Sequence, residues 1–264
     1  MDDIVKINDL TFKYDDKLVF DHLNLSIKRN SLTTITGRNS CGKTTLIKIL
    51  CGFEKFNGYI NIDGINLKKD NLDDIRMKIG VVLDTNNQVF VGETVIDEIA
   101  FVLENLCYPK EDIQKEINRV SKLLQLNSIL NLDPNNLTDE NKLLVSLGCA
   151  LVVKPSILIL DSTFDMIDNK ESLLKKLSQI KNMTIINFTT NSNDFLYSDE
   201  IIVLDKGKVV LKGNPEDVYN NDDIFDELGL EWPFMVDLSK KLQFYDLIDD
   251  VILDMDEMVD KLWK

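Results

Sequence analysis

The chain has no long apolar run, a single histidine and fewer basic than acidic residues. No segment approaches the roughly 18 uninterrupted apolar residues from which a membrane-spanning helix is built. We therefore expect another protein to hold this chain wherever it works at a membrane. The first residues, Met1-Asp2-Asp3, are acidic, which argues against a secretory or organellar targeting signal.

The shortage of basic residues excludes further classes of function. Lys and Arg number 30 against 45 Asp and Glu, a formal net charge of −15. Binding to nucleic acid needs basic patches that displace counterions from the phosphates, and anionic lipid surfaces attract basic segments, so both roles are disfavoured. Much of the acidity lies late, between Glu216 and Asp260, where we interpret it as a solvated face.

Cysteine and histidine are too sparse and too scattered to predict a metal centre. Cys41, Cys51, Cys107 and Cys149 show no C-x-x-C spacing, and no cysteine pair flanks His22. We therefore expect free thiols in a reducing compartment and no zinc site.

What the chain does contain is the pattern of an α/β protein, in a length of 264 residues that suits one or two domains. Alternating apolar residues at 4–14 and 23–27 predict half-buried antiparallel strands. Short apolar or β-branched segments predict further strands at 32–36, 58–62, 79–83, 157–160, 184–188, 201–204 and 209–211. Helical spacing predicts helices at 44–50, 94–106, 111–126 and 139–153, and short helices after Pro215.

Residues 37–44, Gly-Arg-Asn-Ser-Cys-Gly-Lys-Thr, fit the phosphate-loop pattern G-x-x-x-x-G-K-[ST] between a predicted strand and a predicted helix. Glycines let the backbone wrap a polyphosphate, and the helix N-terminus points N–H groups at it. Lys43 is predicted to reach the β- and γ-phosphates, and the Thr44 hydroxyl a Mg²⁺ ion. A chance match on a Gly-Lys turn is the alternative, which the flanking elements disfavour.

Asp161 directly follows the apolar segment 157–160. A carboxylate at the end of a buried strand is the usual partner of phosphate-loop Mg²⁺. An aspartate that only caps a strand-to-helix turn is the alternative, but the phosphate loop upstream favours the metal role. The two motifs together predict binding of ATP with Mg²⁺.

Five further segments carry a resemblance to a known family: Leu-Thr-Phe-Lys-Tyr at 10–14, Thr-Asn-Asn-Gln-Val-Phe at 85–90, Glu-Thr-Val-Ile-Asp-Glu-Ile-Ala-Phe at 93–101, Leu-Asp-Lys-Gly-Lys-Val-Val at 204–210 and Leu-Gly-Leu-Glu-Trp-Pro at 228–233. With them the chain resembles the ATPase subunits of ATP-binding-cassette (ABC) transporters, more narrowly those of energy-coupling factor (ECF) transporters. The implied fold is an α/β P-loop NTPase core with an antiparallel β subdomain and a helical subdomain at about 93–153, all within 1–214. A small C-terminal helical dimerisation domain follows at 215–264.

The resemblance also implies partners and a place of work. ATP is held between the phosphate loop of one ATPase and a signature loop of a second, in a homodimer or a heterodimer. A membrane-embedded subunit docks near residues 84–96 on the cytoplasmic face of the cell membrane. Uptake of a vitamin or a transition-metal ion proceeds through a separate substrate-binding membrane protein.

The implied site residues fall into two overlapping groups. The metal is assigned to Thr44, Asp84 and Asp161. Nucleotide contacts are assigned to Tyr14, which stacks on adenine in the family, and to the phosphate loop and the residue after it: Gly37, Arg38, Asn39, Ser40, Cys41, Gly42, Lys43, Thr44 and Thr45.

The chain departs from the family pattern at the catalytic positions. After Asp161 the family has a glutamate that polarises water, but this chain has Ser162; loss of a general base costs on the order of 10²–10⁴ in rate. Thr190 stands where the family has a histidine, and Asp84 replaces a glutamine, a change that Mg²⁺ tolerates. The family's signature loop, Leu-Ser-Gly-Gly-Gln, corresponds to Leu-Thr-Asp-Glu-Asn at 137–141, where Asp139 and Glu140 replace the glycines and would crowd and repel a phosphate. The same residues also suit a helix start, with Thr138 as the cap and acids in the first turn.

Three functions therefore compete. The first is a transport ATPase subunit with weak, partner-dependent hydrolysis. The second is a regulatory or structural subunit that binds nucleotide and leaves turnover to an active ATPase. The third, an ABC protein acting on nucleic acid, is disfavoured by the acidic charge.

Overall fold

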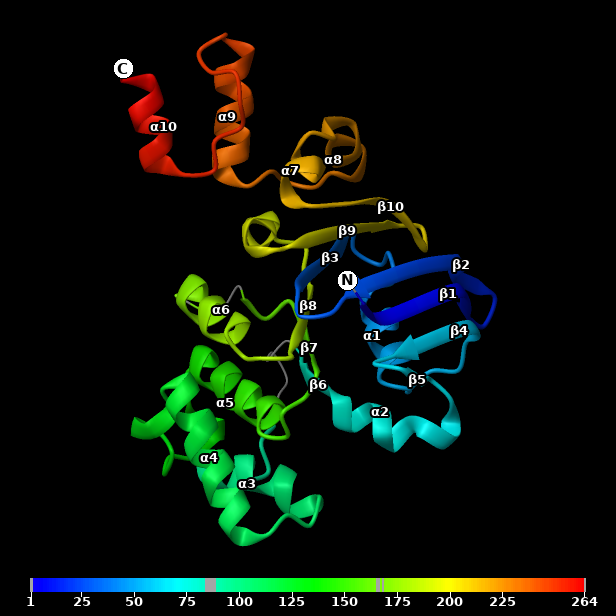
Figure 1. Cartoon of the computed structure of the whole chain (residues 1–264), viewed down its shortest axis with the longest axis vertical. Coiled ribbons are helices and arrows are strands. Elements are labelled where there is room, and N and C mark those ends of the chain that lie inside the picture. The colour runs from blue at the N-terminus through cyan, green and yellow to red at the C-terminus, as the bar shows by residue number, and fades with distance from the viewer. Residues whose placement is uncertain (1, 84–88, 165–166, 168, 264) are drawn as a thin grey trace.

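The computed structural model describes residues 2–83, 89–164, 167 and 169–263, and arranges them in two sheets with helices around them (Figure 1). The strands are β1 Asp3–Tyr14, β2 Lys17–Lys28, β3 Leu32–Gly37, β4 Asn57–Ile62, β5 Ile65–Asn66, β6 Ile79–Val82, β7 Ile157–Asp161, β8 Thr184–Phe188, β9 Glu200–Asp205 and β10 Lys208–Gly213. The α-helices are α1 Lys43–Leu50, α2 Leu72–Lys78, α3 Val95–Asn105, α4 Lys110–Leu124, α5 Asp139–Leu151, α6 Lys170–Ser178, α7 Pro215–Tyr219, α8 Asp222–Leu228, α9 Phe234–Phe244 and α10 Met255–Leu262.

The antiparallel sheet has the strand order β2-β1-β4-β5 and confirms the prediction from alternating residues. Apolar side chains of β1 such as Ile7 and Leu10 are fully buried, while polar neighbours such as Asn8 face out. The register between β1 and β2 shifts between Ile7 and Leu10, where Asp9 has a φ of 57°. This bulge lets both halves of the long strand keep their apolar side chains on the inner face.

The six-stranded sheet has the order β10-β9-β3-β8-β7-β6. From β9 to β6, each strand runs parallel to its neighbour. Its central strands are buried on both faces, which explains why β7 reads as a continuous apolar run. Because β3, β8 and β7 are parallel neighbours, their carboxyl ends meet at one edge. The phosphate loop, Thr189 and Ser162 therefore lie at that same edge.

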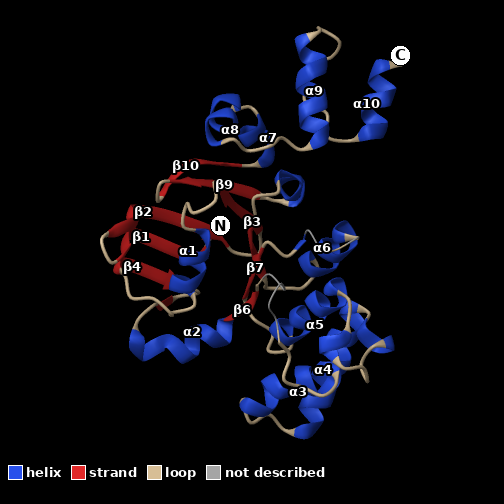
Figure 2. Cartoon of the chain, turned by 180° about the vertical axis from the view of Figure 1, so that it is seen from behind, coloured by secondary structure: helices blue, strands red, loops and turns tan. Residues whose placement is uncertain are grey.

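The helices α3, α4 and α5 form a group beside β6, on the opposite side from the antiparallel sheet (Figure 2). Ile99, Val120 and Leu147, one from each helix, lie in a shared buried cluster. The sequence predicted these helices but missed α2 and α6. Within the part of the chain that the structure describes, no helix combines the length and apolar content needed to cross a bilayer.

After Pro215 the chain forms four short helices, of which α9 and α10 stand apart from the sheets at one end of the molecule (Figure 1). The first two helices pack on β9 and β10 through a cluster that includes Val203 and Phe225. The ring of Phe225 stacks on Trp232 with centroids 3.8 Å apart. This stack fixes the segment that leads into α9.

The turn between β9 and β10 gives a stability prediction. Gly207 has a φ of 75°, and a Cβ there would lie 2.1 Å from the carbonyl oxygen of Val19, whereas Gly64, at a φ of 82°, has open space. We expect Gly64→Ala to lower the free energy of unfolding by roughly 1–2 kcal/mol, the cost of a left-handed residue. Gly207→Ala should cost about 1–3 kcal/mol more because the backbone must shift. Urea unfolding measures both; equal losses would contradict the close packing of this turn on β2.

Candidate nucleotide-binding site

The phosphate loop is held by two glycines in conformations that L side chains rarely adopt. Gly37 has a φ of 145°, and a Cβ there would lie 2.0 Å from the carbonyl oxygen of Leu204. Gly42 has a φ of 112°, and a Cβ there would lie 2.8 Å from the ring of Phe20. The loop can follow this path only with glycine at both positions.

The phosphate loop leads into α1, whose N-terminus has no side-chain cap. Gly42 provides no side-chain cap, and the first turn of α1 contains no acidic residue. By contrast, α3 and α5 begin with Thr94 and Thr138 as capping side chains and have acids in their first turns. An uncapped N-terminus leaves donor N–H groups and a partial positive charge available to an anion.

Lys43 is folded back over the loop. Its Nζ donates hydrogen bonds to the carbonyl oxygens of Gly37 at 2.7 Å and Arg38 at 3.2 Å, and lies 3.8 Å from Cys41 Sγ. Burial raises the pKa of the Cys41 thiol, although the nearby Lys43 ammonium opposes this shift. The thiol is therefore neutral near pH 7 and adds no negative charge where a phosphate would bind.

A cavity of about 670 Å³ opens at this edge of the sheet. Most of the predicted site residues line it: Tyr14, Asn39, Ser40, Cys41, Gly42, Lys43, Thr44, Thr45, Asp161, Ser162 and Thr190. Segments separated by more than a hundred residues are thus brought to one place by the parallel strands β3, β8 and β7. The cavity has the size and the mixed polarity of a site for a small anionic ligand.

Three predicted residues stand apart from this cavity. Gly37 and Arg38 do not line it; Arg38 Nε instead donates a hydrogen bond of 3.0 Å to the carbonyl oxygen of Leu228, at the end of α8. Asp84 lies outside the described residues. The predicted nucleotide contact of Arg38 can therefore come only from its backbone in this conformation.

Five lining residues were missed by the sequence. They come from the start of β2 and from the β9–β10 turn: Lys17, Leu18, Val19, Lys206 and Gly207. The first three follow the turn that ends β1 and the last two form the β9–β10 turn, and neither turn carries a chemical motif. Close to them, Tyr14 packs edge-on against Phe12 with centroids 4.8 Å apart, and its hydroxyl donates to Glu54 at 3.1 Å.

Two positions that the resemblance predicts to be catalytic carry hydroxyl groups. Ser162 follows β7 at a φ of 51°, and its N–H donates to the carbonyl oxygen of Phe188 at 2.8 Å. Thr190 is exposed just beyond β8. The single histidine of the chain, His22, is not among the lining residues; it contacts Asp9, whose hydrogen bond raises the pKa of the imidazole. Neither hydroxyl is a useful base at neutral pH.

The predicted signature loop lies outside the cavity, at the start of α5. The Thr138 hydroxyl accepts a hydrogen bond of 3.4 Å from the N–H of Asn141, and Asp139 and Glu140 occupy the first turn. This is the arrangement of a well-capped helix. The residues that depart from the family's signature loop therefore stabilise the start of the helix itself.

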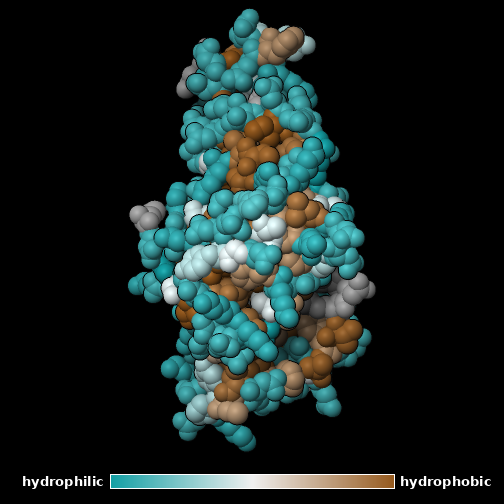
Figure 3. Space-filling model, turned by 90° about the vertical axis from the view of Figure 1, so that its right-hand side faces the viewer, coloured by the Kyte–Doolittle hydropathy of each residue, from teal (hydrophilic) through white to brown (hydrophobic). Residues whose placement is uncertain are grey.

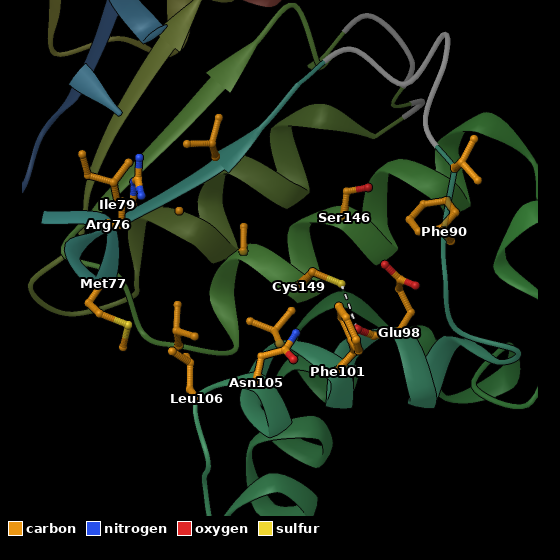
Figure 4. Close-up of a pocket in the computed structure, with 16 residues that line it drawn as sticks. Arg76, Met77, Ile79, Phe90, Glu98, Phe101, Asn105, Leu106, Ser146 and Cys149 are labelled. Atoms are coloured by element: carbon orange, nitrogen blue, oxygen red, sulfur yellow. Dashed lines mark hydrogen bonds between the residues drawn. The ribbon is translucent and has the colours of Figure 1, made fainter. Parts of the chain in front are cut away.

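A second cavity, of about 510 Å³, lies between the α2–β6 segment and helices α3 and α5 (Figure 4). Its wall is mainly apolar and includes Met77, Phe90 and Phe101. Glu98 holds the segment before α3 in place at this cavity. Its Oε2 accepts hydrogen bonds from the N–H groups of Val91 at 2.8 Å and Gly92 at 2.7 Å. The carbonyl oxygen of Glu98 also accepts from Cys149 Sγ at 3.7 Å.

A phosphate loop between a parallel strand and a helix, with Asp161 at the end of a nearby parallel strand, defines a P-loop nucleotide-binding protein. The family model described as "ABC transporter" matches residues 20–165. A solved structure of cbiO1 from Clostridium perfringens, part of the ABC transporter complex cbiONQ, superposes with a TM-score of 0.78 at 27% identity, over 91% of this chain and all of that one. The ATP-binding cassette MJ0796, a dimer bound to ADP and Pi, gives a TM-score of 0.70 at 25% identity, over 80% of this chain and 98% of that one.

Two relatives show to which branch of the ABC family the chain belongs. The energy-coupling factor transporter ATP-binding protein EcfA of Pediococcus pentosaceus is 36% identical, over 97% of this chain and 95% of its own length. EcfA1 of Mesomycoplasma hyopneumoniae is 32% identical, over 99% and 98%. The chain belongs to the ABC transporter ATP-binding proteins and, within them, to the energy-coupling factor ATPases, which confirms the resemblance and the fold class inferred from the sequence.

The position of Lys43 gives a binding prediction. Charge-assisted hydrogen bonds are worth about 1.5–3 kcal/mol, so Lys43→Ala should weaken MgATP binding by roughly 10- to 150-fold in titration calorimetry. Lys48→Ala, a control on the exposed face of the same helix, should bind as the unchanged protein does. Equal affinity in the Lys43 variant would contradict the assignment of this cavity to the triphosphate.

Proposed function

We propose that the chain is the ATP-binding subunit of an ECF-type ABC transporter, in which ATP binding and hydrolysis power uptake of a vitamin or a transition-metal ion. One observation carries the ATP site: a single cavity joins the uncapped N-terminus of α1 to Asp161. Backbone N–H groups and a carboxylate that line one cavity suit a phosphate chain and its metal ion.

The residues that would hold MgATP follow from this cavity. Among the described residues, Lys43 hydrogen-bonds to carbonyl oxygens of the phosphate loop and to a thiol. It can exchange these weak partners for phosphate oxygens. The Thr44 hydroxyl and the Asp161 carboxylate would hold Mg²⁺, which neutralises phosphate charge when bound, and Tyr14 offers its ring to adenine.

Hydrolysis by this chain alone is expected to be weak. At the two positions where the family places a base and a histidine, Ser162 and Thr190 hold hydroxyls that neither accept the proton of water nor stabilise charge as imidazolium does. A regulatory or structural subunit that binds nucleotide and leaves turnover to an active ATPase is the second candidate. The full-length likeness to transporter ATP-binding proteins does not favour it.

A second ATPase subunit completes the proposed site. Asp139 and Glu140 do not line the cavity of their own chain, so the signature loop can serve only a nucleotide bound elsewhere. In a dimer with an intact ATPase, one site would combine the phosphate loop of this chain with the unaltered signature loop of the partner. In the other site, its acidic first turn would face the partner's nucleotide.

The apolar cavity beside α3 is the proposed docking place of the membrane-embedded subunit. Val89, Val91 and Phe101 expose 82%, 68% and 46% of their surfaces around it, and Figure 3 shows apolar surface beside the grey residues in the lower half of the molecule. Such exposure marks an interaction surface. Docking there would place the chain on the cytoplasmic face of the membrane, where the substrate-binding membrane protein is a further partner.

The differences from the family's catalytic residues give a prediction for the rate of ATP hydrolysis. We expect the purified chain to bind MgATP but hydrolyse it very slowly, in a phosphate-release assay with Lys43→Ala as the blank. Ser162→Glu should restore little activity, because Thr190 and the acidic signature loop remain. Brisk hydrolysis that Lys43→Ala abolishes would overturn the claim of impaired catalysis. Revival by Ser162→Glu alone would show that the other departures matter little.

The docking cavity gives a separate prediction. Phe101→Arg places a charge on the apolar wall and should reduce co-purification with the membrane-embedded subunit by tenfold or more, about 1.4 kcal/mol, while MgATP binding is unchanged. Val210→Arg on β10, at a residue of similar exposure, is the control. Undiminished co-purification of the Phe101 variant would place the membrane subunit elsewhere.

A further inference from the structure

A third cavity, of about 600 Å³, lies between the turn after α1, the β4–β5 hairpin and the start of α2. These elements lie together at one side of the molecule (Figure 1). Among the described residues, the cavity shares no lining residue with the nucleotide cavity or with the cavity beside α3. Its volume is within the range of sites for small molecules, and neither proposed role of the chain uses it.

Hydrogen bonds hold the walls of this cavity in place. The N–H of Leu67 donates to the carbonyl oxygen of Ile60 at 2.8 Å, which closes the hairpin beside it. The hydroxyl of Tyr59 donates to Oδ1 of Asn66 at 2.5 Å, and the side-chain amide of Asn71 donates to the carbonyl oxygen of Asn66 at 3.2 Å. The hollow is therefore built into the fold between the hairpin and α2.

The wall of the cavity is apolar and largely aromatic. Phe53 and Tyr59 line it and expose 71% and 43% of their surfaces. Phe56 and Leu72 line it too, and both also pack against the buried core. The guanidinium carbon of Arg76 lies 5.3 Å from the centre of the Phe53 ring. Exposed rings around a hollow suit the apolar part of a small ligand.

Three exposed lysines, Lys55, Lys68 and Lys69, line the same cavity. Within the part of the chain that the structure describes, none of the three has an ion pair, whereas Lys78 on α2 pairs with Asp63 at 2.5 Å. The positive charge of the three lysines therefore remains available to an anion.

The acidic residues nearby do not neutralise these lysines. Glu54 is the one acid among the described lining residues, and its Oε1 accepts a hydrogen bond of 3.1 Å from the hydroxyl of Tyr14. Asp70 and Asp73 are close in the sequence but do not line the cavity. In a chain with a net charge of −15, the cavity thus carries a local excess of positive charge.

We propose that this cavity binds a small amphipathic anion, a molecule with an apolar ring or chain and one acidic group. The apolar part would lie against Phe53 and Tyr59, and the acidic group near the lysines. A purely ionic ligand would gain little, because salt and water screen exposed charges. A neutral apolar ligand would leave the lysines without a partner. The inference does not depend on the proposed function, since the site is separate from the nucleotide cavity.

The experiment is titration calorimetry of the full chain with 2-naphthoate, which has one apolar ring system and one carboxylate. The test variant carries Lys55→Gln, Lys68→Gln and Lys69→Gln. The matched control carries Lys110→Gln, Lys115→Gln and Lys122→Gln, an equal change in net charge at exposed lysines of α4. The neutral probe 2-naphthamide tests whether the acidic group is required.

We expect the test variant to bind 2-naphthoate at least tenfold more weakly than the unchanged chain or the control. The unchanged chain should bind 2-naphthamide at least tenfold more weakly than 2-naphthoate. Phe53→Ser should weaken the binding of 2-naphthoate, whereas Phe234→Ser, at another exposed ring, should not. Absence of 2-naphthoate binding, or equal binding by the test variant and the control, would overturn the proposal.

A second measurement distinguishes a soluble ligand from a lipid, because both can be amphipathic anions. The chain is floated with vesicles of phosphatidylglycerol. Flotation of the unchanged chain that the three lysine substitutions abolish would identify the ligand as a lipid. Binding of 2-naphthoate without flotation would identify it as a soluble molecule.

Discussion

The arrangement of the site depends on one constraint, the parallel pairing of β3, β8 and β7. Residues of β3 pair with β8 from Leu32 to Ile35, and β7 pairs with β8 from Ile157 to Asp161. These strands are buried on both faces, so any shift in register would misplace buried side chains or break the ladder. A fixed register in turn fixes the loops at the carboxyl ends. The phosphate loop, Ser162 and Thr190 share a cavity for this reason.

Much of this arrangement was readable from the sequence, because continuous apolar strands, a glycine-bounded loop and amphipathic helices each leave a pattern. The helix α2 was missed because only Ile75 is buried in it, and a single buried residue produces no periodicity. The residues Lys17 and Lys206 were missed because their place in the cavity depends on how a turn packs on a distant strand. The sequence also gave no sign that the Arg38 side chain would bind α8 instead of facing the cavity.

The two helix N-termini show what phosphate binding requires. In α1 the position before the helix is a glycine and the first turn has no acid, so N–H groups stay unsatisfied at a cost in helix stability. In α5 a threonine cap and two acids satisfy the same groups. A helix cannot do both, because a cap that stabilises the N-terminus occupies the donors and reverses the local charge. The start of α1 is therefore open to an anion, whereas the start of α5 is closed to one.

The same asymmetry bears on which chain stands opposite. In the proposed ATPase dimer, a second copy of this chain would place the acidic start of α5 opposite each bound nucleotide. A different ATPase with an intact signature loop would remove this conflict in one site. Within this chain, the hydrogen bond from Arg38 to Leu228 ties the phosphate loop to the base of the C-terminal helices. The nucleotide site and the C-terminal helices are thus parts of one connected structure.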